Sequence, residues 1–87
     1  MEIRLIEESE SDLAYWEKTN NKQVLKRISE LFTSMLDNPK KGIGKPEPLK
    51  YGLSGYWSRR IDHGNRIVYR IEEEIIWVIS LKDIISS

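Results

Sequence analysis

The sequence contains no cysteine and only one histidine, His63, among its 87 residues. Disulfide bonds are therefore excluded, and so are zinc sites built from several cysteine and histidine ligands. The longest apolar run, from Ile75 to Ile79, is far shorter than the ~20 residues of a bilayer-crossing helix. The acidic start of the chain lacks the basic segment and apolar core of a signal peptide. These absences predict a small cytoplasmic protein with one domain, residues 1–87.

Net charge is also absent, because fourteen basic side chains balance fourteen acidic ones. The two signs are nevertheless separated along the chain. Residues 37–70 carry eight basic and three acidic side chains (+5), whereas residues 1–20 carry two and six (−4). Since charges act over about 8–10 Å at physiological salt, a basic cluster can bind phosphate even on a neutral protein. A solvated surface of mixed charge is the alternative that the charge pattern leaves open.

Hydrophobic periodicity predicts a short strand followed by two helices. The alternation over residues 2–6 indicates the strand. Ser9 or Ser11, with acidic neighbours, indicates the start of a first helix that ends near Asn20. A second apolar stripe has the spacing of a longer helix, which Pro39 ends. The members of that stripe are Val24, Ile28, Leu31, Phe32 and Met35.

Three further strands are expected, at residues 56–62, 66–71 and 75–81. They follow the segment Pro39 to Tyr51, which holds all three prolines and is interpreted as an ordered loop. This order predicts an α+β fold, in which an antiparallel four-stranded sheet carries the N-terminal helical hairpin on one face. The other face is expected to be a shallow basic surface. The last strand is apolar on both sides, so its open side is expected to accept a partner.

The first two of these strands are expected to form a hairpin with a turn at His63-Gly64-Asn65. If Gly64 takes a positive φ, Asp62 pairs with Arg66. Even-numbered residues, including Arg60 and Arg66, then share the open face. Odd-numbered residues share a core face that is apolar apart from Arg59.

One segment combines a rigid backbone with charge: Gly44-Lys45-Pro46-Glu47-Pro48-Leu49-Lys50. The two prolines restrict the backbone on both sides of Glu47. A fixed carboxylate beside arginines suits phosphodiester cleavage, because the carboxylate can take the proton of a ribose 2′-hydroxyl while guanidinium groups hold the phosphate. An ion pair that only braces the loop is the alternative.

The same segment, with others, resembles the YoeB/Txe family of the RelE superfamily. The resemblance extends over nearly the whole chain and implies a RelE-like fold. It also implies a type II toxin that is an endoribonuclease and cleaves messenger RNA in the ribosomal A site, leaving a cyclic phosphate. The implied partners are a YefM-type antitoxin and the ribosome-bound message, with no metal or cofactor. The matching runs are GKPEPLK at 44–50, LSG at 53–55, WSRR at 57–60, RIVYRI at 66–71 and LAYW at 13–16.

The resemblance implies roles for individual residues. Glu47 matches the general base of the family, and Arg66 matches the arginine that stabilises the phosphate in the transition state. Aromatic residues on the open face are candidates for stacking on bases. Together, the candidates for substrate binding are Lys50, Arg60, Arg59, Lys45 and Tyr56.

The C-terminus departs from the family pattern S-x-[KR]-x-H-Y, whose histidine protonates the leaving 5′-oxygen. Ile84 and Ile85 stand where the histidine and tyrosine are expected. Isoleucine cannot donate a proton, so Lys82 becomes the candidate substitute acid, with Lys50 as another candidate. His63 is interpreted as a solvated turn residue, because its turn is expected at the far end of a strand from the site.

Three functions remain as hypotheses. The favoured one is an active, ribosome-dependent endoribonuclease. The second is a toxin homologue that is weakened or inactive in catalysis but still binds an antitoxin, which Ile84 and Ile85 favour. The third, a gyrase inhibitor of the ParE type on the same fold, is disfavoured by the GKPEPLK segment. The sequence leaves open whether the chain forms a homodimer.

Overall fold

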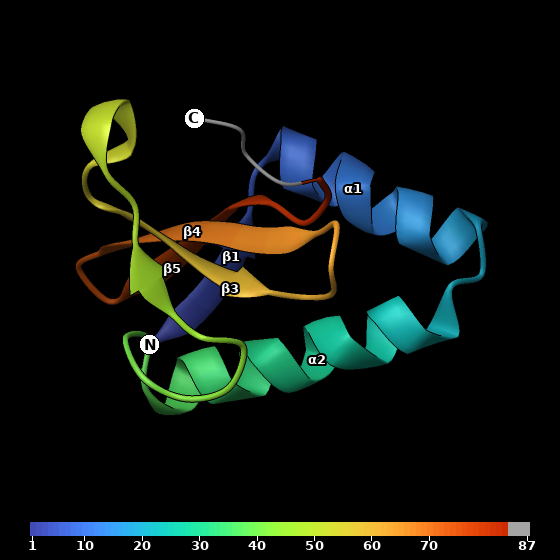
Figure 1. The fold of residues 1–87 in the computed structure, drawn as a ribbon, viewed down its shortest axis with the longest axis horizontal. Coiled ribbons are helices and arrows are strands. Elements are labelled where there is room, and N and C mark those ends of the chain that lie inside the picture. Colours follow the sequence, from blue (N-terminus) through green and yellow to red (C-terminus); the bar gives the residue numbers. More distant parts are fainter. Residues whose placement is uncertain (84–87) are drawn as a thin grey trace.

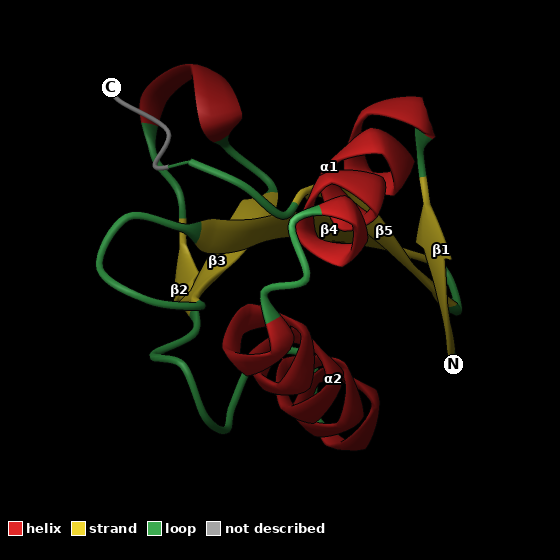
Figure 2. Cartoon of the chain, turned by 90° about the vertical axis from the view of Figure 1, so that its right-hand side faces the viewer, coloured by secondary structure: helices red, strands yellow, loops and turns green. Residues whose placement is uncertain are grey.

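The computed structural model describes residues 1–83, which form one β-sheet and two α-helices. The elements in chain order are β1 (Glu2–Leu5), α1 (Glu7–Lys18), α2 (Lys22–Asp37), β2 (Glu47–Pro48), a 3₁₀ turn (Tyr51–Leu53), β3 (Tyr56–Arg60), β4 (Arg66–Glu72) and β5 (Ile75–Ser80). Figure 1 shows the strands crossing the centre of the molecule. In Figure 2 helix α1 is drawn over the strands and α2 lies below them, and both helices pack into the same core against the sheet.

The sheet has the strand order β1-β5-β4-β3-β2. The predicted α+β fold with a helical hairpin is confirmed, but the prediction of four antiparallel strands is wrong in two respects. β1 runs parallel to β5, and β2 adds a fifth strand at the edge beside β3. Sequence alternation reveals a strand but not its direction, which depends here on the long crossover through both helices. Pro48 is tolerated in β2 because an edge strand has one free side.

The first helix begins at Glu7, earlier than predicted, with Ile6 as its N-cap residue. Ser9 lies inside the first turn, where its Oγ accepts a hydrogen bond from the Ile6 N–H at 2.9 Å and donates one to the Val78 carbonyl at 2.7 Å. The serine therefore caps the helix from its third position and also ties α1 to β5.

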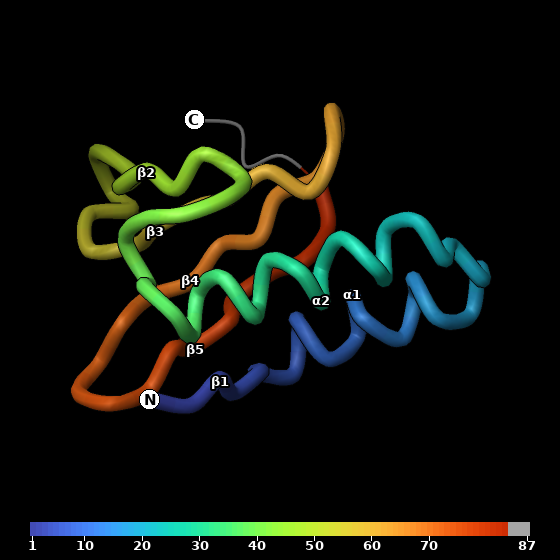
Figure 3. Tube along the Cα trace, turned by 90° about the horizontal axis from the view of Figure 1, so that it is seen from below, coloured from blue at the N-terminus to red at the C-terminus, as the bar shows by residue number. Residues whose placement is uncertain are grey.

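The hydrophobic core lies between the two helices and one face of the sheet. The helices lie side by side (Figure 3) and contribute Trp16 together with the predicted stripe of α2, in which Phe32 is only half-buried. The sheet and its connections contribute Ile61, Ile67, Tyr69, Ile76, Val78 and Leu81. None of the helices formed by residues 1–83 combines the length and the apolar character that a bilayer crossing requires.

The β3–β4 hairpin has a longer turn than predicted. Arg60 pairs with Arg66, so five residues, 61–65, connect the strands, and Gly64 does not take a positive φ. Instead, Asp62 Oδ1 accepts hydrogen bonds from the Gly64 N–H and the Asn65 Nδ2, both at 2.9 Å. The register differs from the predicted one by two residues, which preserves the alternation of side chains. The predicted faces are therefore confirmed, and the two arginines share the open face.

Candidate active site

Glu47 and Arg66 meet on the open face of the sheet, as predicted. β2 places Glu47 opposite Ser58. Arg66 Nη1 donates to Glu47 Oε1 at 3.1 Å and to Ser58 Oγ at 3.0 Å. The Glu47 side chain is 56% exposed, and that of Arg66 is 20% exposed. The carboxylate is thus oriented by an arginine and still open to a substrate. The predicted proximity is confirmed, and the catalytic role of the pair remains a prediction.

The segment that leads to Glu47 is held on both sides. The Arg60 N–H donates to the Gly44 carbonyl at 2.7 Å, and β2 then pairs with β3. Gly44 has a φ of +81°, and an added Cβ would lie 2.6 Å from Leu31 Cδ2 in α2. Glycine is required here by the backbone conformation and by the close approach to the helix. The position of Glu47 is therefore fixed by the backbone as well as by its ion pair.

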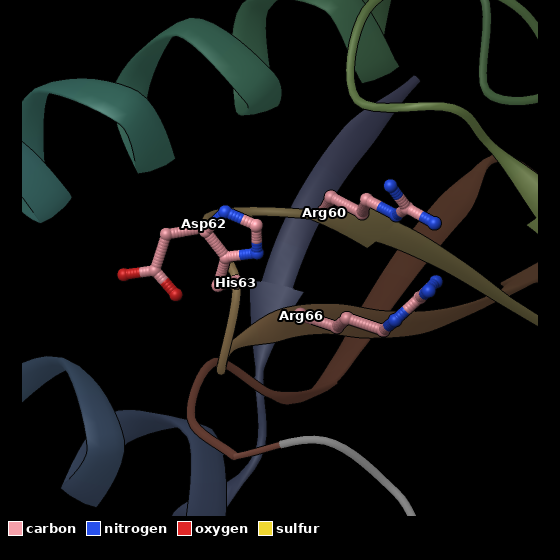
Figure 4. Close-up of a pocket in the computed structure, with 4 residues that line it drawn as sticks. All are labelled: Arg60, Asp62, His63 and Arg66. Atoms are coloured by element: carbon pink, nitrogen blue, oxygen red, sulfur yellow. The ribbon is translucent and has the colours of Figure 1, made fainter.

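A pocket of about 440 Å³ lies at the β3–β4 turn beside this ion pair. Arg60, Asp62, His63 and Arg66 line it, as the close-up in Figure 4 shows. In that view the two arginine side chains project in the same direction, away from the turn that carries Asp62 and His63. Paired guanidinium groups offer several donors in a geometry that matches phosphate oxygens. The pocket is therefore suited to a phosphodiester group.

Arg59 is not part of this surface, and its predicted role in substrate binding is wrong. Its side chain lies on the helix side of β3 and is completely buried. All its donor nitrogens are used inside the fold, which leaves the guanidinium group no access to RNA. The five hydrogen bonds, 2.7–3.2 Å long, go to the hydroxyl groups of Ser34 and Tyr69 and to the carbonyls of Asn38, Lys41 and Ile43.

Tyr69 completes the network around Arg59. Its hydroxyl accepts from Arg59 Nε at 3.1 Å and donates to the Pro39 carbonyl at 2.7 Å. Burial raises the pKa of Tyr69 above its ordinary value of 10.0, and the hydrogen bond from Arg59 offsets part of that rise. The phenol therefore keeps its proton and its bond to the loop that follows α2.

The other predicted substrate-binding residues lie outside the pocket lining. Lys45 and Lys50 are exposed on either side of Glu47 in the sequence, and Lys45 takes a positive φ of 52°. Tyr56 is half-buried at the opposite end of β3 from Arg60. Contacts between these three residues and RNA remain predictions.

Lys82, the predicted substitute acid, is directed toward α1. Its Nζ lies 4.4 Å from the centroid of the Tyr15 ring and 3.9 Å from Asp83 Oδ2. The structure therefore does not bring this ammonium group to the pocket. Ile84 and Ile85 lie outside the described residues.

His63 is predicted to lie at the far end of a strand from the site, but its turn is closer to the pocket than this implies. His63 is an exposed turn residue, as expected, but its turn borders the pocket, and its side chain helps to line it. The reason is the pairing of Arg60 with Arg66, which puts both pocket arginines at the turn end of their strands. The sequence carries this signal, since the two arginines directly flank the turn segment.

Comparisons with known proteins identify the family of this chain. A family model described as "YoeB-like toxin of bacterial type II toxin-antitoxin system" matches residues 5–84. The chain belongs to this family. The curated Toxin YoeB of Escherichia coli (strain K12) is 42% identical to it over 78 residues, which cover 90% of this chain and 92% of the relative.

Solved structures show the same fold. A YoeB/ParE toxin from Agrobacterium tumefaciens superposes with a TM-score of 0.93 at 33% identity, over 98% of this chain and 100% of that one. The toxin in a YoeB-YefM complex from Staphylococcus aureus gives a TM-score of 0.86 at 40% identity, over 95% of each chain. This YoeB-like chain is therefore a toxin of the type II toxin–antitoxin class, as the resemblance implied.

Proposed function

We propose that this YoeB-like toxin acts in the cytoplasm as an endoribonuclease that cleaves messenger RNA in the ribosomal A site. The observation that carries the proposal is the half-exposed Glu47 carboxylate, held by Arg66 at 3.1 Å beside a pocket with a second arginine. A surface ion pair of this kind contributes only about 0–1 kcal/mol to stability, so stabilisation of the loop is a weak explanation for the Glu47–Arg66 pair. A role in binding and activating a phosphodiester explains the pair better.

In the proposed reaction Glu47 is the general base. Its carboxylate takes the proton of a ribose 2′-hydroxyl, and the freed oxygen attacks the adjacent phosphorus. Arg60 and Arg66 stabilise the negative charge that builds up on the phosphoryl oxygens. Within residues 1–83 the hydrogen bonds of the Arg66 side chain use Nη1, so Nη2 and Nε can serve the phosphate. The products are a 2′,3′-cyclic phosphate and a 5′-hydroxyl end.

We also propose that the chain binds an antitoxin of the YefM type. The YoeB toxin of Staphylococcus aureus has been solved in complex with YefM. In this chain Trp77 and Ile79 of β5 are half-buried, and the same sheet carries Arg60 and Arg66. An acidic, amphipathic segment that folds on binding would cover apolar and basic groups together.

The nuclease proposal is tested with translating ribosomes that hold a defined codon in the A site. The purified chain is expected to cut within that codon, and Glu47→Gln should lower the rate by about 10²–10⁴-fold, because the amide cannot accept the proton. The matched control is Glu72→Gln, since Glu72 is also an exposed glutamate paired with an arginine, Arg70, at 2.6 Å. The control variant is expected to cut at the original rate.

A second function, antitoxin binding without cleavage, is favoured by Ile84 and Ile85 in place of the histidine and tyrosine of the family pattern. The same experiment separates the two. If the unmodified chain cuts no message above background but binds a YefM-type peptide, the nuclease proposal fails and the binding function stands. Equal cleavage by the Glu47→Gln variant would instead reject Glu47 as the base.

A further inference from the structure

The pocket brings the only histidine of the chain to the arginines that would hold the phosphate. His63 lines it together with Arg60 and Arg66. The turn is anchored on both sides of the imidazole: Asp62 Oδ1 accepts two hydrogen bonds from the residues that follow, and Asn65 Oδ1 accepts one from the Asp83 N–H at 2.7 Å. Among the described residues no hydrogen bond or ion pair occupies the imidazole. The turn is therefore anchored, and the exposed imidazole is available to a ligand.

Cleavage by a 2′-hydroxyl also requires a proton for the leaving 5′-oxygen, because an alkoxide is a poor leaving group. Ile84 cannot supply it, and the Lys82 ammonium is directed at Tyr15. An imidazole can donate a proton as well as accept one, which makes histidine a common general acid. Resting on the nuclease function proposed above, we propose that His63 is the general acid of this toxin.

The arrangement of the site agrees with an in-line displacement, in which base and acid act from opposite sides of the phosphorus. Glu47 contacts Arg66 at Nη1, the far end of the side chain. Figure 4 shows that this end points away from the turn that carries His63. The carboxylate therefore lies at one end of the Arg66 side chain and the turn that carries the imidazole at the other. The proposal requires the leaving oxygen of the bound phosphodiester to face that turn.

Glu47 takes the 2′-hydroxyl proton while the 2′-oxygen forms its bond to phosphorus and the bond from phosphorus to the 5′-oxygen breaks. The imidazolium of His63 gives its proton to that oxygen, which leaves as a hydroxyl group. Glu47 is then neutral and His63 is neutral, and exchange of one proton through water restores both. No oxidation, metal or further reactant enters.

A message with a single 5′-bridging sulfur at the scissile linkage tests this role, because a thiolate leaves without being protonated. On ribosomes programmed with the all-oxygen message, His63→Gln should slow cleavage by about 10²–10⁴-fold. On the 5′-thio message the same variant should cut at nearly the rate of the unmodified chain. Glu47→Gln should slow both messages, since the base is needed for either leaving group. His63 is exposed, so an unchanged thermal midpoint is expected and shows that the variant is folded.

The outcomes are distinct. If His63→Gln leaves all-oxygen cleavage unchanged, or slows both messages by the same factor, His63 is not the acid, and the nuclease proposal is untouched. If the unmodified chain cuts neither message, the nuclease function itself fails, and the role of His63 fails with it. Loss on the all-oxygen message with rescue by sulfur is the result that establishes the inference.

Discussion

Arg59 and Arg60 are neighbours in β3, but they lie on opposite faces of the sheet and in opposite surroundings. Arg59 is completely buried and makes five hydrogen bonds to the protein, whereas Arg60 is exposed and lines the pocket. The residue type alone therefore does not decide the role of an arginine. What decides it is whether the fold already satisfies the donors of the guanidinium group.

The two faces are nevertheless connected through the loop between α2 and β2. Arg59 and Tyr69 hold the start of this loop through backbone carbonyls, including that of Pro39. The end of the same loop carries Glu47 to the open face. The buried arginine thus helps to place the carboxylate that the exposed arginine contacts, and the comparison can be tested by removing each guanidinium group separately.

The largest expected effect is the loss of stability in Arg59→Met. Methionine fills part of the volume but leaves buried carbonyl groups without donors, and each orphaned group costs about 1–3 kcal/mol. We expect the free energy of unfolding to fall by at least about 3 kcal/mol. At about 4–8 °C per kcal/mol for a domain of this size, the thermal midpoint should fall by roughly 12–24 °C. Thermal unfolding followed by circular dichroism measures this.

Arg60→Met is the control, because it makes the same change one residue away on the exposed face. Its unfolding free energy should stay within about 0.5 kcal/mol of the original. Similar midpoints for the two variants would show that the buried network contributes little and would remove the proposed contrast between the faces.

The next effect is catalytic. Arg66→Met removes a donor to the phosphoryl group, which is expected to lower the cleavage rate on programmed ribosomes by about 10²–10³-fold. Stability should fall by about 1–2 kcal/mol, because the ion pair with Glu47 is partly exposed but the buried Ser58 hydroxyl loses its hydrogen-bond partner. Rate and thermal midpoint are measured on the same preparation.

Arg70→Met is the matched control for this variant. Arg70 also lies in β4, on the same face, and pairs with exposed Glu72. Its loss should leave both rate and stability close to the original values. A variant at Arg66 that lost stability as severely as Arg59→Met, with no specific loss of rate per folded molecule, would assign Arg66 a structural role.

The sequence was sufficient for much of the fold, because local periodicity carries that information. The stripe of α2 from Val24 to Met35 is buried as predicted. The proximity of Glu47 and Arg66 also followed from local features, namely the two prolines and the alternation in β3 and β4. Such patterns report which side of an element faces inward.

The predictions that failed concern contacts between distant parts of the chain. The parallel pairing of β1 with β5 joins residues more than seventy positions apart, and nothing within either strand encodes its direction. For Arg59 the alternation did indicate the core face, but its main acceptors are backbone carbonyls, which have no signature in a sequence. A buried arginine satisfied by the main chain therefore cannot be told from a substrate-binding one by residue type.

The smallest expected effect concerns the buried hydrogen-bond network around Arg59. Tyr69→Phe removes the hydroxyl that bonds to Arg59 and Pro39, which should lower the unfolding free energy by about 1–2 kcal/mol near pH 7.

Burial raises the pKa of Tyr69 above 10.0, so the unfolded chain loses this proton before the folded one does. The stability that the neutral phenol contributes is thus full below about pH 10 and is lost as the pH rises through the folded pKa. Urea unfolding should show the two proteins converging above pH 10, and Tyr51→Phe, at an 88% exposed tyrosine, should show no such trend. A difference that stays constant up to high pH would mean that the ionisation of Tyr69 is not coupled to folding.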